Sequence, residues 1–338
     1  MFKTIRKVLV IKLRDIGDIV LSTPALNTIY ENTNYPGIIY VVKKGYGNFK
    51  YLLPNVKEVI EYDRKSVFSF FSLIFKLRKH KFDLAVNFHA SFRSALIVLF
   101  SGAKFRLVHN HSGKDYFSSV PLNIEEKPKK NTLRDLDTLA PLKMKTTPET
   151  LKTRLVLKDE ISLLLDFDEV EGAVGFGIGA KRREKIWDKE KFIRLGRKFA
   201  EAGDTVIICC IEKEKKEGKE IAQAIGENAR LYISHFLHFA HYISRMKVFV
   251  GNDSALIHIA AAAGTRTVAL FGPENPEEWH PYEEKDGHIA VSHLKEMEKE
   301  GIDILDRRFR EKSREPMDRI TVDEVYEAAK KLTEEKEV

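Results

Sequence analysis

The feature that most constrains the fold is a strand, helix, strand pattern in the second half of the chain. Apolar residues 248–250 end in the turn Gly-Asn-Asp-Ser, an Ala-rich stretch continues to Gly264, and residues 267–271 are again apolar. This order predicts two parallel strands joined by a helix. With Asp253 or Ser254 as its cap, the helix directs free N–H groups and its positive dipole end to the carboxyl edge of the sheet. That arrangement suits a diphosphate, although an ordinary capped helix has the same pattern.

The same alternation of apolar strands and helical stretches runs through both halves of the chain. Strands are predicted at residues 8–11, 38–42, 84–88 and 105–108, and again at 173–176, 205–211, 230–233, 248–250 and 267–271. Between these two series, residues 127–151 are rich in Lys, Thr and Pro, with a helix expected at 132–140 and a loop or linker at 141–148. Because 338 residues are many for one core, the pattern predicts two α/β domains, each with a doubly wound parallel sheet.

A second informative segment follows the first strand. Apolar residues 8–11 lead through Gly17 and Asp18 into a helical stretch, which places a carboxylate in the loop where open α/β sheets carry their chemistry. The segment has one glycine where the dinucleotide pattern G-x-G-x-x-G needs three, and the chain contains no P-loop Gly-Lys-Ser/Thr. Nicotinamide chemistry and ATP hydrolysis are therefore disfavoured. Helix capping is the alternative role for Asp18.

The net charge of +7 is unevenly distributed. Residues 1–150 carry 25 Lys and Arg against 13 Asp and Glu, whereas the remaining residues carry 32 against 37. A basic half beside an acidic half indicates that one domain meets an anionic partner, such as a lipid headgroup, a phosphorylated acceptor or a nucleic acid. No helix-turn-helix, zinc-finger or RNA-recognition pattern occurs, so we expect no nucleic acid partner.

The sequence also bears on location and cofactors. No signal peptide and no apolar segment of membrane-spanning length is recognisable, so a cytoplasmic protein is expected. Cys209 and Cys210 are adjacent within an apolar run and are interpreted as buried thiols. No His, Cys, Asp or Glu cluster has the spacing of metal ligands, and we expect neither a metal nor a cofactor.

Residues 64–81 form an unusual stretch in which four phenylalanines are bracketed by Lys and Arg. A core-facing stripe at helical spacing would contain Val67, Phe71, Ile74 and Phe75, which leaves Phe68 and Phe70 outside it. The segment is therefore either an ordinary core helix or a basic aromatic helix that lies in a membrane interface.

Five segments are distinctive in combination: Gly17-Asp18, residues 82–104, Lys185-Ile186-Trp187, residues 252–261 and residues 320–325. In this order and spacing they resemble the heptosyltransferase family, glycosyltransferase family 9, of lipopolysaccharide glycosyltransferases. The resemblance implies the GT-B architecture, in which two Rossmann-like domains face a central cleft. It also implies an acceptor-binding domain at residues 1–160, a donor-binding domain at 161–318, and a C-terminal helix at 319–338 that packs back on the first domain.

The resemblance assigns roles to individual residues. Asp18 matches the catalytic base that takes the proton of the acceptor hydroxyl, and Lys185 matches the cation that stabilises the leaving diphosphate. Donor contacts are expected from Lys181, Glu212, Asp253, Ser254, Ala255 and His258, although a histidine on an Ala-rich helix is as often a packed structural residue. Acceptor contacts are expected from His89, Arg93 and Arg14, because Arg binds carboxylates and phosphates with a bidentate fork.

The implied activity is inverting, metal-independent transfer of a heptose from ADP-heptose to the inner core of lipopolysaccharide. The acceptor is then an anionic lipopolysaccharide precursor, and we expect a monomer that associates peripherally with the cytosolic face of the inner membrane. Two alternatives remain: a related transferase that uses another nucleotide sugar to build a cell-surface polysaccharide, and a non-catalytic protein that binds a sugar nucleotide.

Overall fold

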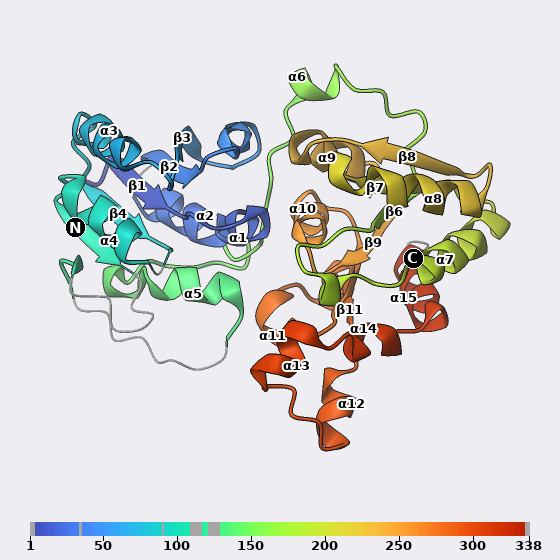
Figure 1. The fold of residues 1–338 in the computed structure, drawn as a ribbon. Coiled ribbons are helices and arrows are strands. Elements are labelled where there is room, and N and C mark those ends of the chain that lie inside the picture. The colour runs from blue at the N-terminus through green and yellow to red at the C-terminus, as the bar shows by residue number, and fades with distance from the viewer. Residues whose placement is uncertain (1–3, 34–35, 90, 109–116, 121–128, 335–338) are drawn as a thin grey trace. The chain divides into compact units, whose positions relative to one another are not determined.

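The computed structural model describes residues 4–33, 36–89, 91–108, 117–120 and 129–334. The chain divides into two compact units, Met1–Val156 and Leu157–Val338 (Figure 1). From the sequence, this boundary was expected after residue 160, with a loop or linker at 141–148. In the structure the residues up to Val156 remain part of the first unit. The N–H of Arg154 donates to Thr23 Oγ1 (3.1 Å), and the N–H of Val156 donates to the Leu52 carbonyl (2.7 Å).

A five-stranded parallel sheet, ordered β3-β2-β1-β4-β5, forms the centre of the first unit. Its strands are β1 (Lys7–Ile11), β2 (Gly37–Lys43), β3 (Val56–Tyr62), β4 (Leu84–Asn87) and β5 (Phe105–Val108). In the middle strand, Val8 is in register with Ile38 of β2 and with Leu84 of β4. Chain order runs outward from β1 in both directions, which makes the β1–β4 pair the topological switch point of this sheet.

Helices pack on both faces of this sheet. They are α1 (Ile16–Leu21), α2 (Thr23–Asn32), α3 (Val67–Arg78), α4 (Phe92–Phe100) and α5 (Asn131–Asp137), with the 3-10 turns η2 (Gly47–Tyr51) and η4 (Ala140–Leu142). α3 buries Leu73 and Leu77 against the face that carries Leu9 and Ile11. On the opposite face, the hydroxyl of Tyr40 hydrogen-bonds the Ser22 hydroxyl between α1 and α2 (2.7 Å).

The second unit repeats this architecture with six parallel strands, ordered β11-β10-β9-β6-β7-β8. Its strands are β6 (Val174–Gly177), β7 (Val206–Cys210), β8 (Ala229–Ile233), β9 (Val248–Asn252), β10 (Thr267–Leu270) and β11 (His288–Val291). Its helices are α6 (Asp159–Ser162), α7 (Lys189–Glu201), α8 (Lys215–Ile225), α9 (Phe236–Ile243), α10 (Ala255–Ala262), α11 (Pro276–Trp279), α12 (Leu294–Lys299), α13 (Arg307–Lys312), α14 (Glu315–Arg319) and α15 (Val322–Glu334), with the turns η5 (Arg183–Lys185), η6 (Glu212–Glu214) and η7 (Glu284–Asp286). Here the switch point is the β6–β9 pair.

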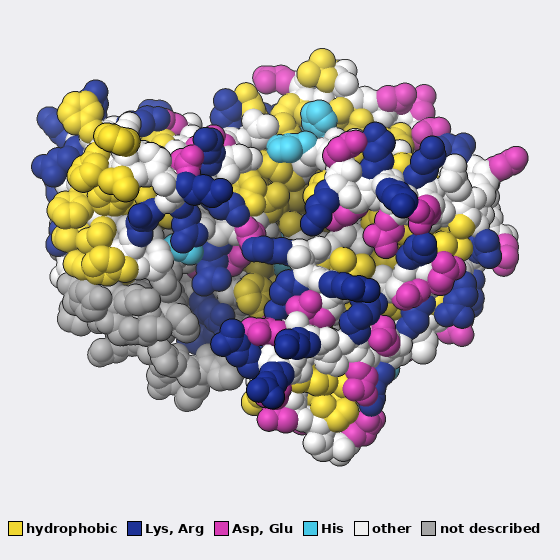
Figure 2. Space-filling model, viewed as in Figure 1, with side chains coloured by type: hydrophobic (Ala, Val, Ile, Leu, Met, Phe, Trp, Pro, Cys, Tyr) yellow, Lys and Arg dark blue, Asp and Glu magenta, His cyan; other side chains and the backbone are white. Residues whose placement is uncertain are grey.

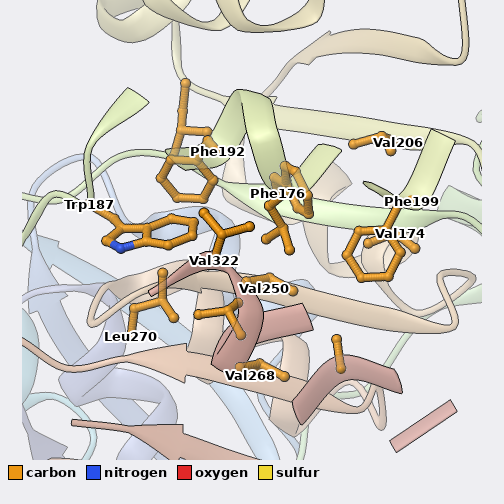
Figure 3. Close-up of a cluster of buried hydrophobic side chains, with 14 of the residues drawn as sticks. Val174, Phe176, Trp187, Phe192, Phe199, Val206, Val250, Val268, Leu270 and Val322 are labelled. Atoms are coloured by element: carbon orange, nitrogen blue, oxygen red, sulfur yellow. The ribbon is translucent and has the colours of Figure 1, made fainter. Parts of the chain in front are cut away.

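The C-terminal helix α15 belongs to the core of the second unit. Val322, Val325, Ala329 and Leu332 are buried in a cluster with Val250, Leu270 and the aromatic side chains of α7 (Figure 3). This segment was expected to pack back on the first domain, whereas the structure shows its apolar stripe covered within its own unit. The opposite face of the sheet is covered by α9 and α10.

The two doubly wound parallel sheets expected from the sequence are confirmed, as are the nine predicted strands. The strands β3 and β11, which were not predicted from the sequence, are edge strands of their sheets. An edge strand needs less burial than a central one, so the alternating Val56–Tyr62 carries no continuous apolar run. Cys209 and Cys210 are both fully buried, as expected.

A buried ion pair joins the residue that follows β1 to α5 in the first unit. The Nζ atom of Lys12 lies 2.7 and 2.8 Å from the two carboxylate oxygens of Asp135, and both side chains are almost inaccessible. Burial raises the pKa of Asp135 to about 6, although Lys12 opposes this rise.

No helix among the described residues is both long and apolar enough to cross a membrane.

Removal of one partner from this pair is expected to be costly. Lys12→Met or Asp135→Leu should each lower the free energy of unfolding by about 3 to 5 kcal/mol, because each leaves one charge buried without its counter-ion. The double variant should recover most of that loss. Urea denaturation of the four proteins measures the coupling, with the exposed pair Lys198–Asp323 as a control that should show little change. Simple addition of the two single losses would contradict the expected coupling.

Candidate functional site

The switch point of the first unit brings two loops to the same edge of the sheet. Ile11 of β1 is in register with Asn87 of β4, and the N–H of Phe88 donates to the Ile11 carbonyl (2.9 Å). The loop after β1 leads to Asp18 in the first turn of α1, and the loop after β4 begins with Phe88 and His89. Asp18 and His89, which the sequence analysis singled out, therefore follow adjacent strands at their carboxyl ends.

Asp18 differs from the carboxylates around it. Asp15, the N-cap of α1, has its Oδ1 2.5 Å from Lys43 Nζ, and Asp135 is held by Lys12. No described residue forms a hydrogen bond or an ion pair with the Asp18 side chain. Its negative charge nevertheless contributes to the raised pKa values of Asp135 and Tyr40, in both cases after the larger effect of burial. Asp18 is thus a carboxylate without a cationic partner among the described residues, close to charges that are already paired.

The three expected acceptor residues have different surroundings. His89 is buried, and its backbone is fixed because its N–H donates to Asn87 Oδ1 (3.0 Å) and its carbonyl accepts from Ser94 Oγ (2.5 Å). Arg14 is exposed, and its positive charge slightly lowers the pKa of Asp135, against the larger effect of burial. Because the charge of Asp18 also acts on Asp135, Arg14 lies in the same region as Asp18. Arg93 is exposed and its guanidinium donates to the backbone carbonyl of Arg64 near the start of α3.

At the switch point of the second unit, one buried amide connects the loops that follow β6 and β9. Asn252, the last residue of β9, donates from Nδ2 to the Ile178 carbonyl (2.7 Å) and accepts at Oδ1 from the N–H of Trp187 (2.9 Å). The indole of Trp187 is itself buried, and its Nε1 donates to the Ile320 carbonyl (3.1 Å). These bonds fix the backbone on both sides of the turn that carries Lys185.

Lys185 and Asp253, which are 68 residues apart, form an ion pair with an Nζ to Oδ2 distance of 2.5 Å. Both side chains are largely buried. Asp253 therefore does not cap α10. Ser254 occupies the N-cap position without a side-chain capping bond, and Ala255 is the first helical residue. The N-terminal turn of α10 thus lies next to a fixed ammonium group.

Glu274 is a member of this cluster that the sequence analysis missed. Its Oε1 lies 2.5 Å from Arg182 Nη2 and 3.8 Å from Lys185 Nζ, and its Oε2 lies 2.6 Å from Arg310 Nη2. Burial would raise the pKa of Glu274, but these three cations hold it below its ordinary value. A carboxylate that is only 7% exposed thus holds two Arg side chains near Lys185. The available sequence signal was Gly272-Pro273 directly after a strand, a turn at the carboxyl edge of the sheet.

The remaining expected donor residues are less clearly placed. Lys181 is exposed, and Glu212 is exposed and pairs with Lys215 (3.0 Å). In contrast to Glu212, Glu214 is half-buried and its carboxylate fills the space beside the Cα of Gly179. Burial raises the pKa of Glu214. His258 is buried and its Nδ1 lies 3.0 Å from the Tyr282 hydroxyl, which agrees with the structural alternative for this residue.

A hollow of about 690 Å³ lies in the second unit near the N-terminal ends of α7 and α8. Its lining includes Ala180, Trp187 and Glu214, but neither Lys185 nor Asp253. The hollow therefore borders the loop after β6 without containing the charge cluster, and we place the candidate site at the cluster. The first unit offers a carboxylate that is able to accept a proton, and the second offers cations fixed for an anionic group.

Comparisons with known proteins identify a family and solved structures with the same fold. The family model described as glycosyltransferase family 9 (heptosyltransferase) matches residues 70–305. Lipooligosaccharide heptosyltransferase 2 of Campylobacter jejuni is 25% identical over 297 residues, which cover 81% of this chain and 83% of that protein. A glycosyl transferase family 9 structure from Veillonella parvula matches with a TM-score of 0.81 at 20% identity and covers 99% of both chains. The E. coli ADP-heptose LPS heptosyltransferase II matches with a TM-score of 0.80 at 21% identity and covers 98% of this chain and 100% of that one.

Loss of the Glu274 charge is expected to destabilise the second unit in a pH-dependent way. Glu274→Gln should lower the free energy of unfolding by about 1 to 3 kcal/mol at pH 7, because it weakens three charge-assisted contacts of a buried group. Since the folded-state pKa of Glu274 lies below its ordinary value of 4.5, the stabilisation is complete above that pH. It is lost as the pH falls through the lower, folded-state pKa.

The difference between wild type and variant should therefore be constant near neutral pH and shrink in acid, as measured by urea denaturation across this range. Glu311→Gln is the matched control, because Glu311 forms an exposed pair with Arg307 on the helix that carries Arg310. It should change stability little. A Glu274→Gln variant as stable as wild type at pH 7 would show that the cluster does not depend on this carboxylate.

Proposed function

Because the chain belongs to glycosyltransferase family 9 (heptosyltransferase), we propose that it transfers a heptose from ADP-heptose to an anionic inner-core lipopolysaccharide acceptor. The proposed reaction inverts the anomeric centre and uses no metal. The first unit binds the acceptor and the second binds the donor. In support, the E. coli protein with the same fold is an ADP-heptose LPS heptosyltransferase, and the Campylobacter jejuni relative is a lipooligosaccharide heptosyltransferase.

The observation that carries the proposal is the chemistry at the two switch points. Open α/β sheets bind ligands outside the carboxyl ends of their strands where the strand order reverses. At the β1–β4 point this chain has Asp18, and at the β6–β9 point it has Lys185 paired with Asp253. A glycosyl transfer needs a base for the acceptor hydroxyl and a cation for the departing diphosphate, and the two points supply one of each.

Asp18 is the proposed general base. The acceptor hydroxyl transfers its proton to the Asp18 carboxylate as its oxygen bonds to the anomeric carbon, and ADP leaves from the opposite face of the sugar. A base must be ionised and unoccupied. Asp15 is held by Lys43 and Asp135 by Lys12, so that of these three carboxylates Asp18 is the one suited to the step.

Lys185 is the proposed stabiliser of the leaving group. As the glycosidic bond breaks, negative charge builds on the β-phosphate, and a cation fixed beforehand stabilises that charge without having to reorganise. Asp253 and Glu274 hold Lys185 and Arg182 in place before the donor binds. The free N–H groups at the start of α10, after Ser254 and Ala255, add donors for the same phosphate.

The acceptor side of the proposal rests on charge. Residues 1–150 carry 25 basic against 13 acidic residues, which suits a phosphorylated, lipid-linked acceptor. Arg14 and His89 leave the same edge of the sheet as Asp18 and are the proposed acceptor contacts, with Arg93 nearby in sequence. We propose a monomer, without a nucleic acid partner, that works at the cytosolic face of the membrane carrying this acceptor.

The donor is tested by thermal shift with ADP-heptose, ADP, and UDP- and GDP-linked sugars. ADP-heptose should stabilise the protein, by about 2.7 kcal/mol at a hundred times its dissociation constant. Lys185→Ala should weaken this shift and also lower kcat, because the attraction of Lys185 to the diphosphate grows in the transition state. The control Lys198→Ala, at an exposed pair on α7, should behave as wild type. Stabilisation by UDP- or GDP-sugars alone would replace ADP-heptose as the donor.

Asp18→Asn is expected to lower kcat by about 10²- to 10⁴-fold while donor affinity stays nearly unchanged, because the carboxylate acts on the acceptor proton. The measurement is release of ADP in the presence of a lipopolysaccharide-core acceptor, with donor binding followed in parallel. Asp15→Asn, which changes the carboxylate held by Lys43, is the matched control and should retain most of the transfer. Turnover near that of wild type in Asp18→Asn would exclude Asp18 as the base.

A further inference from the structure

Helix α3 is apolar on two opposite faces, and only one of them packs on the sheet. Leu73 and Leu77 are buried in the core of the first unit. On the outward side, Phe68 is 88% exposed and Phe71 and Phe75 are each 66% exposed. Their spacing of three and four residues gives one continuous stripe, which we call the phenylalanine face.

This result decides between the two interpretations of residues 64–81. The core stripe considered from the sequence comprised Val67, Phe71, Ile74 and Phe75, but of these only Ile74 packs against the core, and the other three are exposed. The exposed surface extends to the neighbouring helix α4, where Phe92 and Phe100 are 56% and 45% exposed. Figure 2 shows hydrophobic side chains gathered over α3 and α4, with Lys and Arg at their edge.

The charged residues of the segment that carries the phenylalanine face have one sign. Residues 64–82 contain six Lys and Arg and no Asp or Glu. Five of the six cations, Arg64, Lys65, Arg78, Lys79 and Lys81, are exposed beyond the two ends of the stripe or at its last turn. Lys79 also lies over the Phe75 ring, with its Nζ 4.5 Å from the ring centroid. The sixth, Lys76, is paired with Glu58 (2.8 Å).

We propose that the phenylalanine face docks on an anionic lipid bilayer, with its rings among the acyl and headgroup boundary and its cations on lipid phosphates. Apolar side chains rimmed by cations on an interfacial helix bind such a surface by burial and by charge attraction together. A second copy of this chain fits less well, because two such faces would bring the Lys and Arg side chains of one copy against those of the other. The proposal rests on the proposed function only in that the acceptor is membrane-borne.

Sedimentation with phosphatidylcholine vesicles, with and without phosphatidylglycerol, tests the docking in the absence of donor and acceptor. Wild type should bind the anionic vesicles, less at high salt, and bind pure phosphatidylcholine much more weakly. The variant Phe68→Ser/Phe71→Ser/Phe75→Ser should lower the partition coefficient at least about tenfold. Lys65→Gln/Lys79→Gln should lower it by up to about fivefold for each cation that lies at the surface, and flatten its salt dependence.

The matched control is Leu163→Ser/Leu164→Ser. These leucines are 85% and 82% exposed in the second unit, and Asp159, Glu160 and Asp166 lie near them in sequence. Their replacement should leave vesicle binding unchanged, which distinguishes docking from nonspecific adsorption of exposed apolar side chains. Urea denaturation of the Phe variant reports whether it is folded, and ADP-heptose binding reports the donor site, so loss of vesicle binding is distinguished from loss of either.

Equal binding by wild type and the Phe variant would overturn the proposal. The proposal would also be overturned if the wild type does not bind anionic vesicles but runs as a dimer in size-exclusion chromatography, and the Phe variant runs as a monomer. The face would then be a contact between two copies of the chain.

Discussion

The parallel pairing of β1 with β4 and of β6 with β9 is the constraint on which the candidate site depends. In each sheet the chain runs outward from the first strand in one direction and then returns to begin on its other side. The two loops at that point start from the carboxyl ends of adjacent strands and run in opposite directions, so neither connection covers the edge between them. In the second unit the constraint is reinforced by Asn252, whose buried amide bonds to both the Ile178 carbonyl and the Trp187 N–H. The position of Lys185 beside Asp253 follows from those bonds.

The charged groups at the two switch points are arranged differently, in keeping with their proposed roles. In the second unit, Lys185 is held by Asp253 and lies near Glu274, so the cations are fixed before any ligand arrives. A fixed cation costs no reorganisation when charge develops near it. In the first unit, the pairing of Lys12 with Asp135 leaves Asp18 without a cation among the described residues. A base has to remain available for a proton, whereas a stabiliser of negative charge has to remain in place.

How much of the candidate site the sequence could predict depended on distance along the chain. Asp18, Lys185 and Asp253 lie in recognisable local patterns, a Gly-Asp after a strand and a turn before a helix, and the resemblance to a family placed them in order. Glu274 and its contacts were missed, because they join segments 36 to 92 residues apart, and no local pattern signals such a contact. The resemblance to a family pointed to Glu212, whereas the structure distinguishes Glu214 from it by burial, and burial is a property of the folded chain.

By itself, the sequence determined the fold class: two doubly wound parallel sheets follow from apolar runs alternating with helical stretches, because hydrogen bonding and periodicity act over a few residues. It also determined that the first half is basic. Only the tertiary structure decided which of two apolar stripes of α3 is buried, since helical spacing alone permits both Leu73 with Leu77 and Phe71 with Phe75. It likewise decided that α15 completes the core of its own unit. In both cases the choice depends on which neighbouring surface remains uncovered, and that is settled only when distant segments pack together.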